Sequence, residues 1–174
     1  LASQIEPLLS GGTGSVSHTE EVPSFLPDRF EPGTPNIPGI LGLHAALCDL
    51  KQTDMDKLHQ HELELTQYFI NGLMQMDPSE STLRAIGKHN TIERTSVVSV
   101  QTLQTDMARV AYEMDDTYGI MTRVGLHCAP SAHKTLGTYP EGTIRFYFGP
   151  ENTHHEVDLA LHALAEITGS PYHL

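Results

Sequence analysis

The chain has 174 residues, 39% of them hydrophobic and 18% charged, as expected for one folded domain, with or without part of another. Twenty-two acidic against ten basic residues give a net charge of −12, which argues against a nucleic acid partner because the average field repels phosphate. No apolar run is long enough to span a membrane, and residues 1–4 show neither an initiator methionine nor a signal-peptide pattern, so we expect a piece of a longer protein. Its two cysteines are too few for a disulfide framework, which favours a reducing cytoplasm.

The first half of the chain changes from irregular to helical. Residues 1–39 hold six of the 11 prolines and five of the 14 glycines, which favours loops and extended segments. Apolar residues then recur at helical spacing over 37–50 and again over about 54–76, so we expect two amphipathic helices. The buried stripe of the second helix is predicted to consist of Met55, Leu58, Leu65, Phe69, Leu73 and Met76.

Beyond Pro78 the apolar pattern alternates between the periods of strands and helices. In chain order we expect strands over 82–87 and 95–103, a helix over 106–118 capped by Gly119, strands over 120–124 and 143–148, and a last helix that opens with a capping box at 153–156. This order predicts an α+β fold, with a mainly antiparallel sheet covered by helices on one face.

The strand predicted over 143–148 has two different faces. Ile144, Phe146 and Phe148 alternate with polar residues, so Arg145 points to the side opposite these three apolar residues. A guanidinium on a strand could hold a carboxylate with two parallel hydrogen bonds, or it could form a surface ion pair with one of the 22 acidic residues.

Cys128 stands where a thiol could react. It follows the strand predicted over 120–124, beside His127 and five residues after Arg123. Cationic neighbours stabilise a thiolate and a loop gives it access to a substrate, although free cysteines are often buried. The residues alone therefore leave a reactive and a structural role open. The only other cysteine, Cys48, falls on the apolar stripe of a predicted helix, where we expect a packing role, and two cysteines are too few for a disulfide framework.

A metal site is the alternative interpretation of Cys128, with His127 and His133 as further ligands and His154 and His155 nearby in sequence. The spacing matches no standard zinc pattern and a second cysteine ligand is missing. We therefore expect no metal.

The segment 10–15, Ser-Gly-Gly-Thr-Gly-Ser, is rich in glycine and hydroxyl groups. Backbone N–H groups and hydroxyls of such loops can hold a phosphate, although ordinary turns have the same composition. The segment is thus a candidate anion site.

Four stretches together resemble the class V aminotransferase family, and within it the branch of cysteine desulfurases and selenocysteine lyase-like enzymes. They are Ser-Gly-Gly-Thr-Gly-Ser at 10–15, Arg-Phe-Glu-Pro-Gly-Thr-Pro-Asn at 29–36, Arg-Val-Gly-Leu-His-Cys-Ala-Pro at 123–130, and Ile-Arg-Phe-Tyr-Phe-Gly-Pro-Glu-Asn-Thr at 144–153. Their order and separation also fit, so the resemblance covers nearly the whole chain.

The resemblance implies an enzyme that uses pyridoxal 5'-phosphate to move sulfur from L-cysteine to an enzyme cysteine, which becomes a persulfide while L-alanine is released. Cys128 would be the attacking thiolate and Arg145 would hold the substrate carboxylate. Arg123 and His127 would contribute to positioning or charge.

The resemblance also implies a homodimer. Gly12 and Thr13 would contact the phosphate of the cofactor bound to the partner subunit, and Thr34 and Asn36 would lie near the same interface. A sulfur-acceptor protein would be a further partner.

Some residues of the family's cofactor site are expected outside the sequence. The Schiff-base lysine, the stacking histidine and the aspartate that contacts the pyridine nitrogen would all precede Leu1, and Lys134 does not stand in a matching motif. The resemblance assigns 1–35 to the end of the large cofactor-binding domain and 36–174 to the small C-terminal domain. The chain by itself is thus expected to be inactive.

Two other functions stay open. The complete protein could be an aminotransferase or lyase that acts on another amino acid, which would have no use for a thiol on the loop. Alternatively, the chain could be a non-catalytic interaction module, which would explain the missing lysine.

Overall fold

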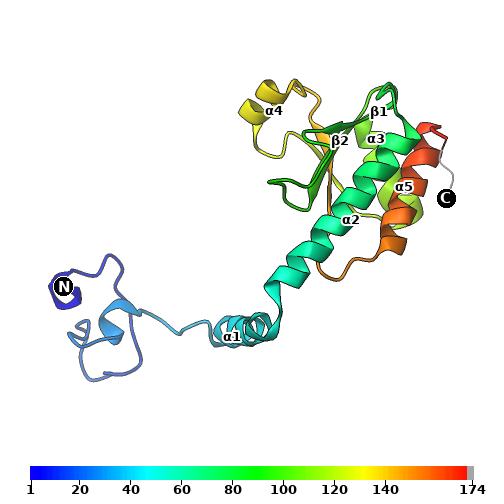
Figure 1. Cartoon of the computed structure of the whole chain (residues 1–174). Helices are drawn as coiled ribbons and strands as arrows, with labels where there is room; N and C mark the ends of the chain where they lie inside the picture. Colours follow the sequence, from blue (N-terminus) through cyan, green and yellow to red (C-terminus); the bar gives the residue numbers. More distant parts are fainter. Residues whose placement is uncertain (172–174) are drawn as a thin grey trace. The chain divides into compact units, whose positions relative to one another are not determined.

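The computed structural model describes residues 1–171 and divides the chain into two compact units, Leu1–Thr53 and Asp54–Leu174. Figure 1 labels their helices and strands. The division at residue 35 expected from the sequence concerns two domains of a parent enzyme and stays a prediction. None of the helices within residues 1–171 combines the length and apolar character that a membrane span requires.

The first unit consists mostly of loops, as its proline and glycine content predicts. It contains two short 3-10 turns, η1 (Ala2–Gln4) and η2 (Asp28–Phe30), before the helix α1 (Ile37–Gln52). Arg29 joins the two turns: its Nε and Nη2 atoms donate to the carbonyl of Ile5 at 3.3 and 3.0 Å, and Nη2 lies 3.4 Å from Glu6.

Helix α1 begins where a side chain can cap it. Asn36 accepts a hydrogen bond from the backbone N–H of Gly39, and Pro38 occupies the first turn, where its missing N–H does no harm. No residue of α1 is buried, so the packing role expected for Cys48 is wrong within this unit: its thiol is exposed. The exposed apolar side chains of the helix are Ile37, Ile40, Leu41, Leu43, Leu47 and Leu50.

The second unit contains all the helices and strands predicted beyond residue 53, with shifted ends, and one more helix. In chain order they are α2 (Met55–Met76), β1 (Leu83–Ile86), β2 (Val97–Thr102), α3 (Met107–Tyr118), β3 (Arg123–Gly125), α4 (Pro130–Leu136), β4 (Thr143–Tyr147) and α5 (His154–Thr168).

The additional helix, α4, lies in the segment that the sequence predicted as a loop. Pro130 is at its first position and Gly137 closes it with φ +69°, the usual signals of a helix start and end. At seven residues it is too short to show an amphipathic period, so the pattern could not predict it. The strand expected over 120–124 also begins later, at Arg123.

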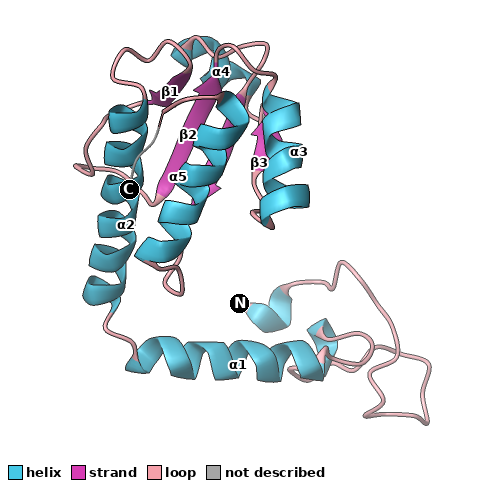
Figure 2. Cartoon of the chain, turned by 90° about the vertical axis from the view of Figure 1, so that its right-hand side faces the viewer, coloured by secondary structure: helices cyan, strands magenta, loops and turns pink. Residues whose placement is uncertain are grey.

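The four strands form an antiparallel sheet in the order β1-β2-β4-β3. Figure 2 shows α2, α5 and α3 together on one face of this sheet, which confirms the predicted α+β fold. Among the described helices of the second unit, α2, α3 and α5 all lie on this face, and the short helix α4 stands apart from them (Figure 1).

The core lies between the sheet and this helical layer. The buried sheet residues Val98, Val100, Ile144 and Phe146 belong to one core cluster with Phe69 of α2, whose ring centroid is 4.8 Å from that of Phe146. Such contacts between large apolar side chains supply most of the stability of a domain of this size.

The buried stripe predicted for α2 is correct only in its second half. Leu65, Phe69, Leu73 and Met76 are buried, whereas Met55 is 52% exposed and Leu58 only half-buried. The prediction for Met55 is wrong because the α2 residues of the core begin at Leu65, so the first turns of the helix have no apolar layer to pack on.

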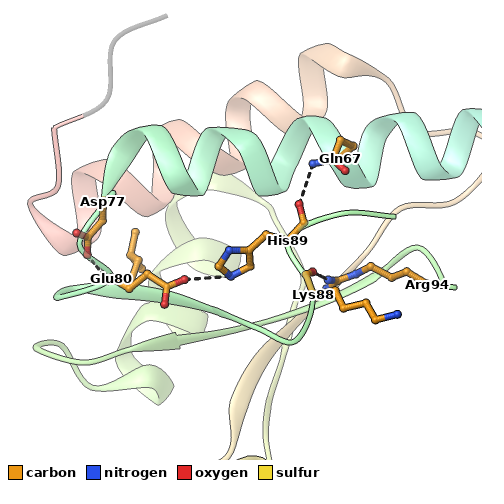
Figure 3. Close-up of polar contacts among 7 residues, drawn as sticks. Gln67, Asp77, Glu80, Lys88, His89 and Arg94 are labelled. Carbon is orange, nitrogen blue, oxygen red and sulfur yellow. Dashed lines mark hydrogen bonds and ion pairs between the residues drawn. The ribbon is translucent and has the colours of Figure 1, made fainter. Parts of the chain in front are cut away.

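Polar contacts join α2 and the residue that ends it to the loops before and after β1 (Figure 3). Gln67 donates from Nε2 to the carbonyl of His89 at 3.1 Å, and His89 Nε2 lies 3.2 Å from Glu80. The carboxylate of Asp77 accepts from the backbone N–H groups of Thr82 at 2.6 Å and Leu83 at 3.0 Å. These bonds fix the start of β1 relative to α2.

Candidate active site

Cys128 lies in a tight turn between β3 and α4. The carbonyl of Leu126 accepts a hydrogen bond from the N–H of Ala129 at 2.8 Å, and the two residues between them, His127 and Cys128, have φ values of +50° and +59°. Two consecutive positive φ angles are typical of type I′ turns, which normally contain Asn-Gly. Each non-glycine residue in this region costs on the order of 1–3 kcal/mol, and such strain concentrates at functional sites. The thiol of Cys128 is exposed.

Two glycines close the loop that carries this turn. Gly125 and Gly142 have φ values of +111° and +82°, and a Cβ atom on Gly142 would lie only 2.3 Å from the carbonyl carbon and oxygen of Gly125. Only glycine therefore permits the two backbones to approach so closely. Residues 126–141, hereafter the thiol loop, thus leave and re-enter the sheet at a single point.

His127 packs inward from the turn while Cys128 stays at the surface. Its Nε2 lies 3.3 Å from Oγ1 of Thr143, and its ring centroid is 5.8 Å from that of His133. Burial lowers the pKa of His127, and Arg145 lowers it further, with smaller contributions from His133 and Arg123 that outweigh the opposite effect of Thr143. The lowered pKa favours the neutral form of His127, and Arg123 and Arg145 are the permanently charged groups that act on it.

Arg123 and Arg145 project from the face of the sheet that lacks the helical layer. They are direct partners in the β3–β4 ladder, and Arg145 is also paired with Ser99 of β2. Within residues 1–171 neither guanidinium has a carboxylate within 4.0 Å, so the surface ion pair considered for Arg145 is not formed there. Two unpaired guanidinium groups suit a small anion such as a substrate carboxylate.

The glycine-rich segment belongs to the first unit. The N–H of Gly33 donates to the carbonyl of Gly12 at 2.8 Å, which brings the matched segments 10–15 and 29–36 together, and Oγ1 of Thr13 lies 2.8 Å from Oγ of Ser15. In the described part of the chain no hydrogen bond is donated by the backbone N–H groups of residues 11–14, and a Cβ on Gly12 would meet nothing within 4 Å. Free N–H groups beside a hydroxyl fit a phosphate.

The same segment lines a cavity of about 290 Å³ that also contains Glu20 and Glu21, whose carboxylates oppose an anion. Gly12 and Thr13 lie in the first unit, and Cys128, His127, Arg123 and Arg145 in the second. The arrangement of candidate site residues relative to one another is therefore described only for the four residues of the second unit.

No group of three or more His, Cys, Asp and Glu residues that could hold a metal occurs within residues 1–171. His133, considered above as a ligand, is buried and contacts the hydroxyl of Thr138 through Nδ1 at 2.7 Å. Lys134 is exposed on α4, with its ammonium 5.0 Å from the ring centroid of Tyr139.

The sequence missed the polar interior of the thiol loop. His133 and Thr138 are separated by a short helix that the pattern did not reveal, so nothing marked them as partners. Only Pro130 and Gly137, which bracket α4, could have indicated that this loop has an inside.

Comparisons with known proteins give a consistent result. The model of the class-V aminotransferase family matches residues 1–160. The chain is 33% identical over 168 residues to a protein of Pyrococcus abyssi and 30% identical over 169 residues to one of Methanothermobacter thermautotrophicus, both named "Probable cysteine desulfurase". Each alignment covers 95% of this chain but only 40% and 41% of those proteins, so the chain spans about two fifths of their length.

Solved structures show the same partial coverage. The apo structure of a cysteine desulfurase from Thermococcus onnurineus NA1 matches 82% of this chain and 34% of its own, with a TM-score of 0.71 and 31% identity. A cysteine desulfurase from Escherichia coli, in an S-sulfonic acid form, matches 92% of this chain and 38% of its own, with a TM-score of 0.64 and 25% identity.

Proposed function

This chain belongs to the class-V aminotransferase family, and we propose that it forms the sulfur-accepting part of a cysteine desulfurase that uses pyridoxal phosphate. The observation that carries the proposal is the exposed thiol of Cys128, held at positive φ in a closed loop beside the sheet face that bears two unpaired guanidinium groups. An aminotransferase or lyase that transfers no sulfur would have no use for this thiol.

Arg145 binds the carboxylate of the substrate, L-cysteine. It is half-buried, it comes from a strand with neighbours on both sides, and it has no carboxylate partner within residues 1–171. A guanidinium fixed in this way offers two parallel donors to a planar carboxylate, which orients the amino acid as well as binding it. Arg123, opposite it and exposed, adds attraction for the anion.

The thiolate of Cys128 is the nucleophile. It attacks the sulfur atom of the bound cysteine, a sulfur–sulfur bond forms, and the bond between Cβ and sulfur of the substrate breaks. The electron pair of the broken bond stays with the carbon fragment, which takes up a proton and leaves as L-alanine. Cys128 is left as a persulfide, and a second protein or small thiol accepts the outer sulfur.

His127 orients the turn and does not supply charge. Because it is neutral and held by Thr143, its imidazole acts as a fixed wall behind Cys128. Its Nδ1 is buried without a hydrogen-bond partner in the described part of the chain, which agrees with a positioning role for the ring.

Pyridoxal phosphate, when bound, supplies the electron withdrawal that weakens the bonds around the α-carbon of the amino acid. The free backbone N–H groups of residues 11–14 and the hydroxyl of Thr13 would hold its phosphate, from the partner subunit of a homodimer. None of the four lysines of this chain stands in the family's cofactor-binding motif, so we propose that the lysine comes from outside the 174 residues. Two free, exposed thiols agree with a reducing, cytoplasmic location.

The test is made on the gene product that contains this chain, loaded with pyridoxal phosphate. Cys128→Ala should abolish sulfide and persulfide formation from L-cysteine, whereas Cys48→Ala, the matched control for loss of an exposed thiol, should keep both. If Cys128→Ala retains the native rate of alanine formation with sulfur release, Cys128 is not the acceptor and the desulfurase proposal fails.

The 174-residue chain provides a second test. After addition of pyridoxal phosphate and L-cysteine it should show no stable shift in the absorbance of the cofactor and should form no alanine. A persistent shift with turnover would mean that Lys134 or another lysine of this chain binds the cofactor.

A further inference from the structure

A chain of hydrogen bonds leads from the sheet into the thiol loop. Gln101 of β2, only 6% exposed, donates from Nε2 to the carbonyl of Gly142 at 3.1 Å and accepts from Nη2 of Arg84 on β1. The N–H of Gly142 donates in turn to the carbonyl of Thr138 at 2.7 Å. The point where the loop re-enters the sheet is therefore bonded directly to β2 and, through Gln101, indirectly to β1.

The chain continues inside the loop through Thr138 and His133. Thr138 is fully buried, and its Oγ1 lies 2.7 Å from Nδ1 of His133 while it also donates to the carbonyl of His133 at 3.4 Å. A hydroxyl has one proton, so both contacts are made together only when Nδ1 of His133 carries a proton and donates to Oγ1. This assigns the tautomer of His133 and leaves its Nε2 without a proton when the ring is neutral.

The ring of His133 connects this hydrogen-bonded chain to the turn that carries Cys128. Its ring packs against that of His127, the residue before Cys128, at a centroid distance of 5.8 Å. The turn itself has one internal backbone bond, from Ala129 to Leu126, and two residues in an unfavourable region of φ. A strained backbone conformation of this kind persists only where contacts with the surrounding structure hold it in place.

We propose that Gln101, Thr138 and His133 are positioning residues for the Cys128 thiol: their hydrogen-bonded chain holds the thiol loop in the shape that presents the nucleophile. None of the three would touch the substrate, and all act through the backbone of Gly142 and the ring of His127. The inference rests on the proposed nucleophilic role of Cys128 and extends it to residues far from it in sequence.

The experiment compares Thr138→Val with Thr138→Ser in the complete 174-residue chain. Valine has the shape of threonine but lacks the hydroxyl, so His133 loses its buried partner, while serine keeps the hydroxyl. The measured quantity is the rate of alkylation of Cys128 by iodoacetamide, divided by the rate for Cys48 in the same molecule, from peptide mass spectrometry. Cys48 lies in the other unit and serves as the internal control.

We expect this ratio to fall roughly tenfold in Thr138→Val and to stay within about twofold of the native value in Thr138→Ser. The imidazole ¹⁵N signals of His127 and His133 should shift in the valine variant and return in the serine variant. A fold-stabilising role alone would lower the unfolding temperature of Thr138→Val and shift the signals of His133, its direct partner, but would leave the alkylation ratio and the signals of His127 unchanged.

An unchanged or increased ratio in folded Thr138→Val overturns the proposal. If that variant does not fold, Gln101→Met decides, because it removes the donor to Gly142, together with the acceptor for Arg84, and leaves Thr138 and His133 unchanged. A native ratio in this variant overturns the proposal, and a reduced ratio supports it. These rates need no cofactor or substrate, so they stay informative if Cys128 proves dispensable for desulfuration. Conversely, the alkylation ratio could be native in Thr138→Val while the Cys128→Ala enzyme is inactive. That combination would reject the positioning chain and support the proposed function.

Discussion

Arg123 and Arg145 face each other across the ladder between β3 and β4, so two like charges occupy directly paired positions of an antiparallel sheet. Like charges at such positions destabilise a sheet, by up to about 1 kcal/mol. No carboxylate within residues 1–171 compensates them. The arrangement therefore costs stability in the free chain, and a bound anion would reduce the repulsion.

Replacing one of these charges should therefore stabilise the protein. For Arg123→Gln we expect the free energy of unfolding to rise by about 0.2–1 kcal/mol at low salt, because the repulsion is removed. The gain should shrink near 1 M salt, where the screening length is only about 3 Å. Urea unfolding at two salt concentrations measures this. Arg109→Gln is the control, since it breaks an attractive pair with Glu113 and should lower stability.

Arg145→Lys should weaken the use of cysteine by the complete enzyme. Lysine keeps the charge but loses the planar fork, so we expect KM for L-cysteine to rise roughly tenfold to a hundredfold with a smaller change in kcat. Steady-state kinetics separate the two constants. A native KM would show that the carboxylate is bound elsewhere, and an equal loss from Arg123→Lys would show that the two arginines act together.

Gly142→Ala should be far more damaging than Gly137→Ala. Both glycines have positive φ, +82° and +69°, so alanine pays the cost of that backbone region, about 1–2 kcal/mol, at either position. At Gly142 the new Cβ would also lie 2.3 Å from backbone atoms of Gly125, whereas at Gly137 it meets nothing within 4 Å. We expect losses of about 1 kcal/mol for Gly137→Ala and above about 3 kcal/mol for Gly142→Ala, from urea unfolding. Equal losses would contradict the close approach.

Asp77 should make stability depend on acid. Burial alone would raise its pKa, but hydrogen bonds from Leu83, Thr82 and Ser79 outweigh burial and lower the pKa to about 2 from 3.8. Because the folded pKa is the lower one, its contribution is complete above about pH 4 and is lost as the pH falls toward 2.

Asp77→Asn should therefore be less stable than the native chain by about 1–2 kcal/mol at pH 7, allowing for solvent screening, and the difference should fade between pH 4 and pH 2. Thermal unfolding as a function of pH measures it. A difference that stays constant down to pH 2 would show that the carboxylate is not stabilised by these bonds.

The sequence predicted the layers of the fold because its long elements carry clear periods. The alternation in β4 was sufficient to place Arg145 on the face opposite Ile144, and the caps of α3 and α5 are formed by the residues expected from the pattern. Such local signals depend on neighbours in the chain, which a sequence displays directly.

What the sequence could not predict depends on contacts between distant residues. Nothing near Gln101 indicates that it would bond to Gly142, and nothing near Cys128 indicates a positive φ, since the usual Asn-Gly signal is absent. The exposure of Met55 and Cys48 has the same origin: the helical period shows which face is apolar, but not whether another element covers it.

The strand order has a consequence for how the site is assembled. β1 and β2 are joined by a local hairpin, whereas β4 lies between β2 and β3 and must pair with residues far earlier in the chain, such as Ser99. Pairings of this kind carry a high loop-closure cost and form slowly. Arg145 and Gly142, which anchors the thiol loop, therefore reach their native positions only when β4 pairs with both β2 and β3.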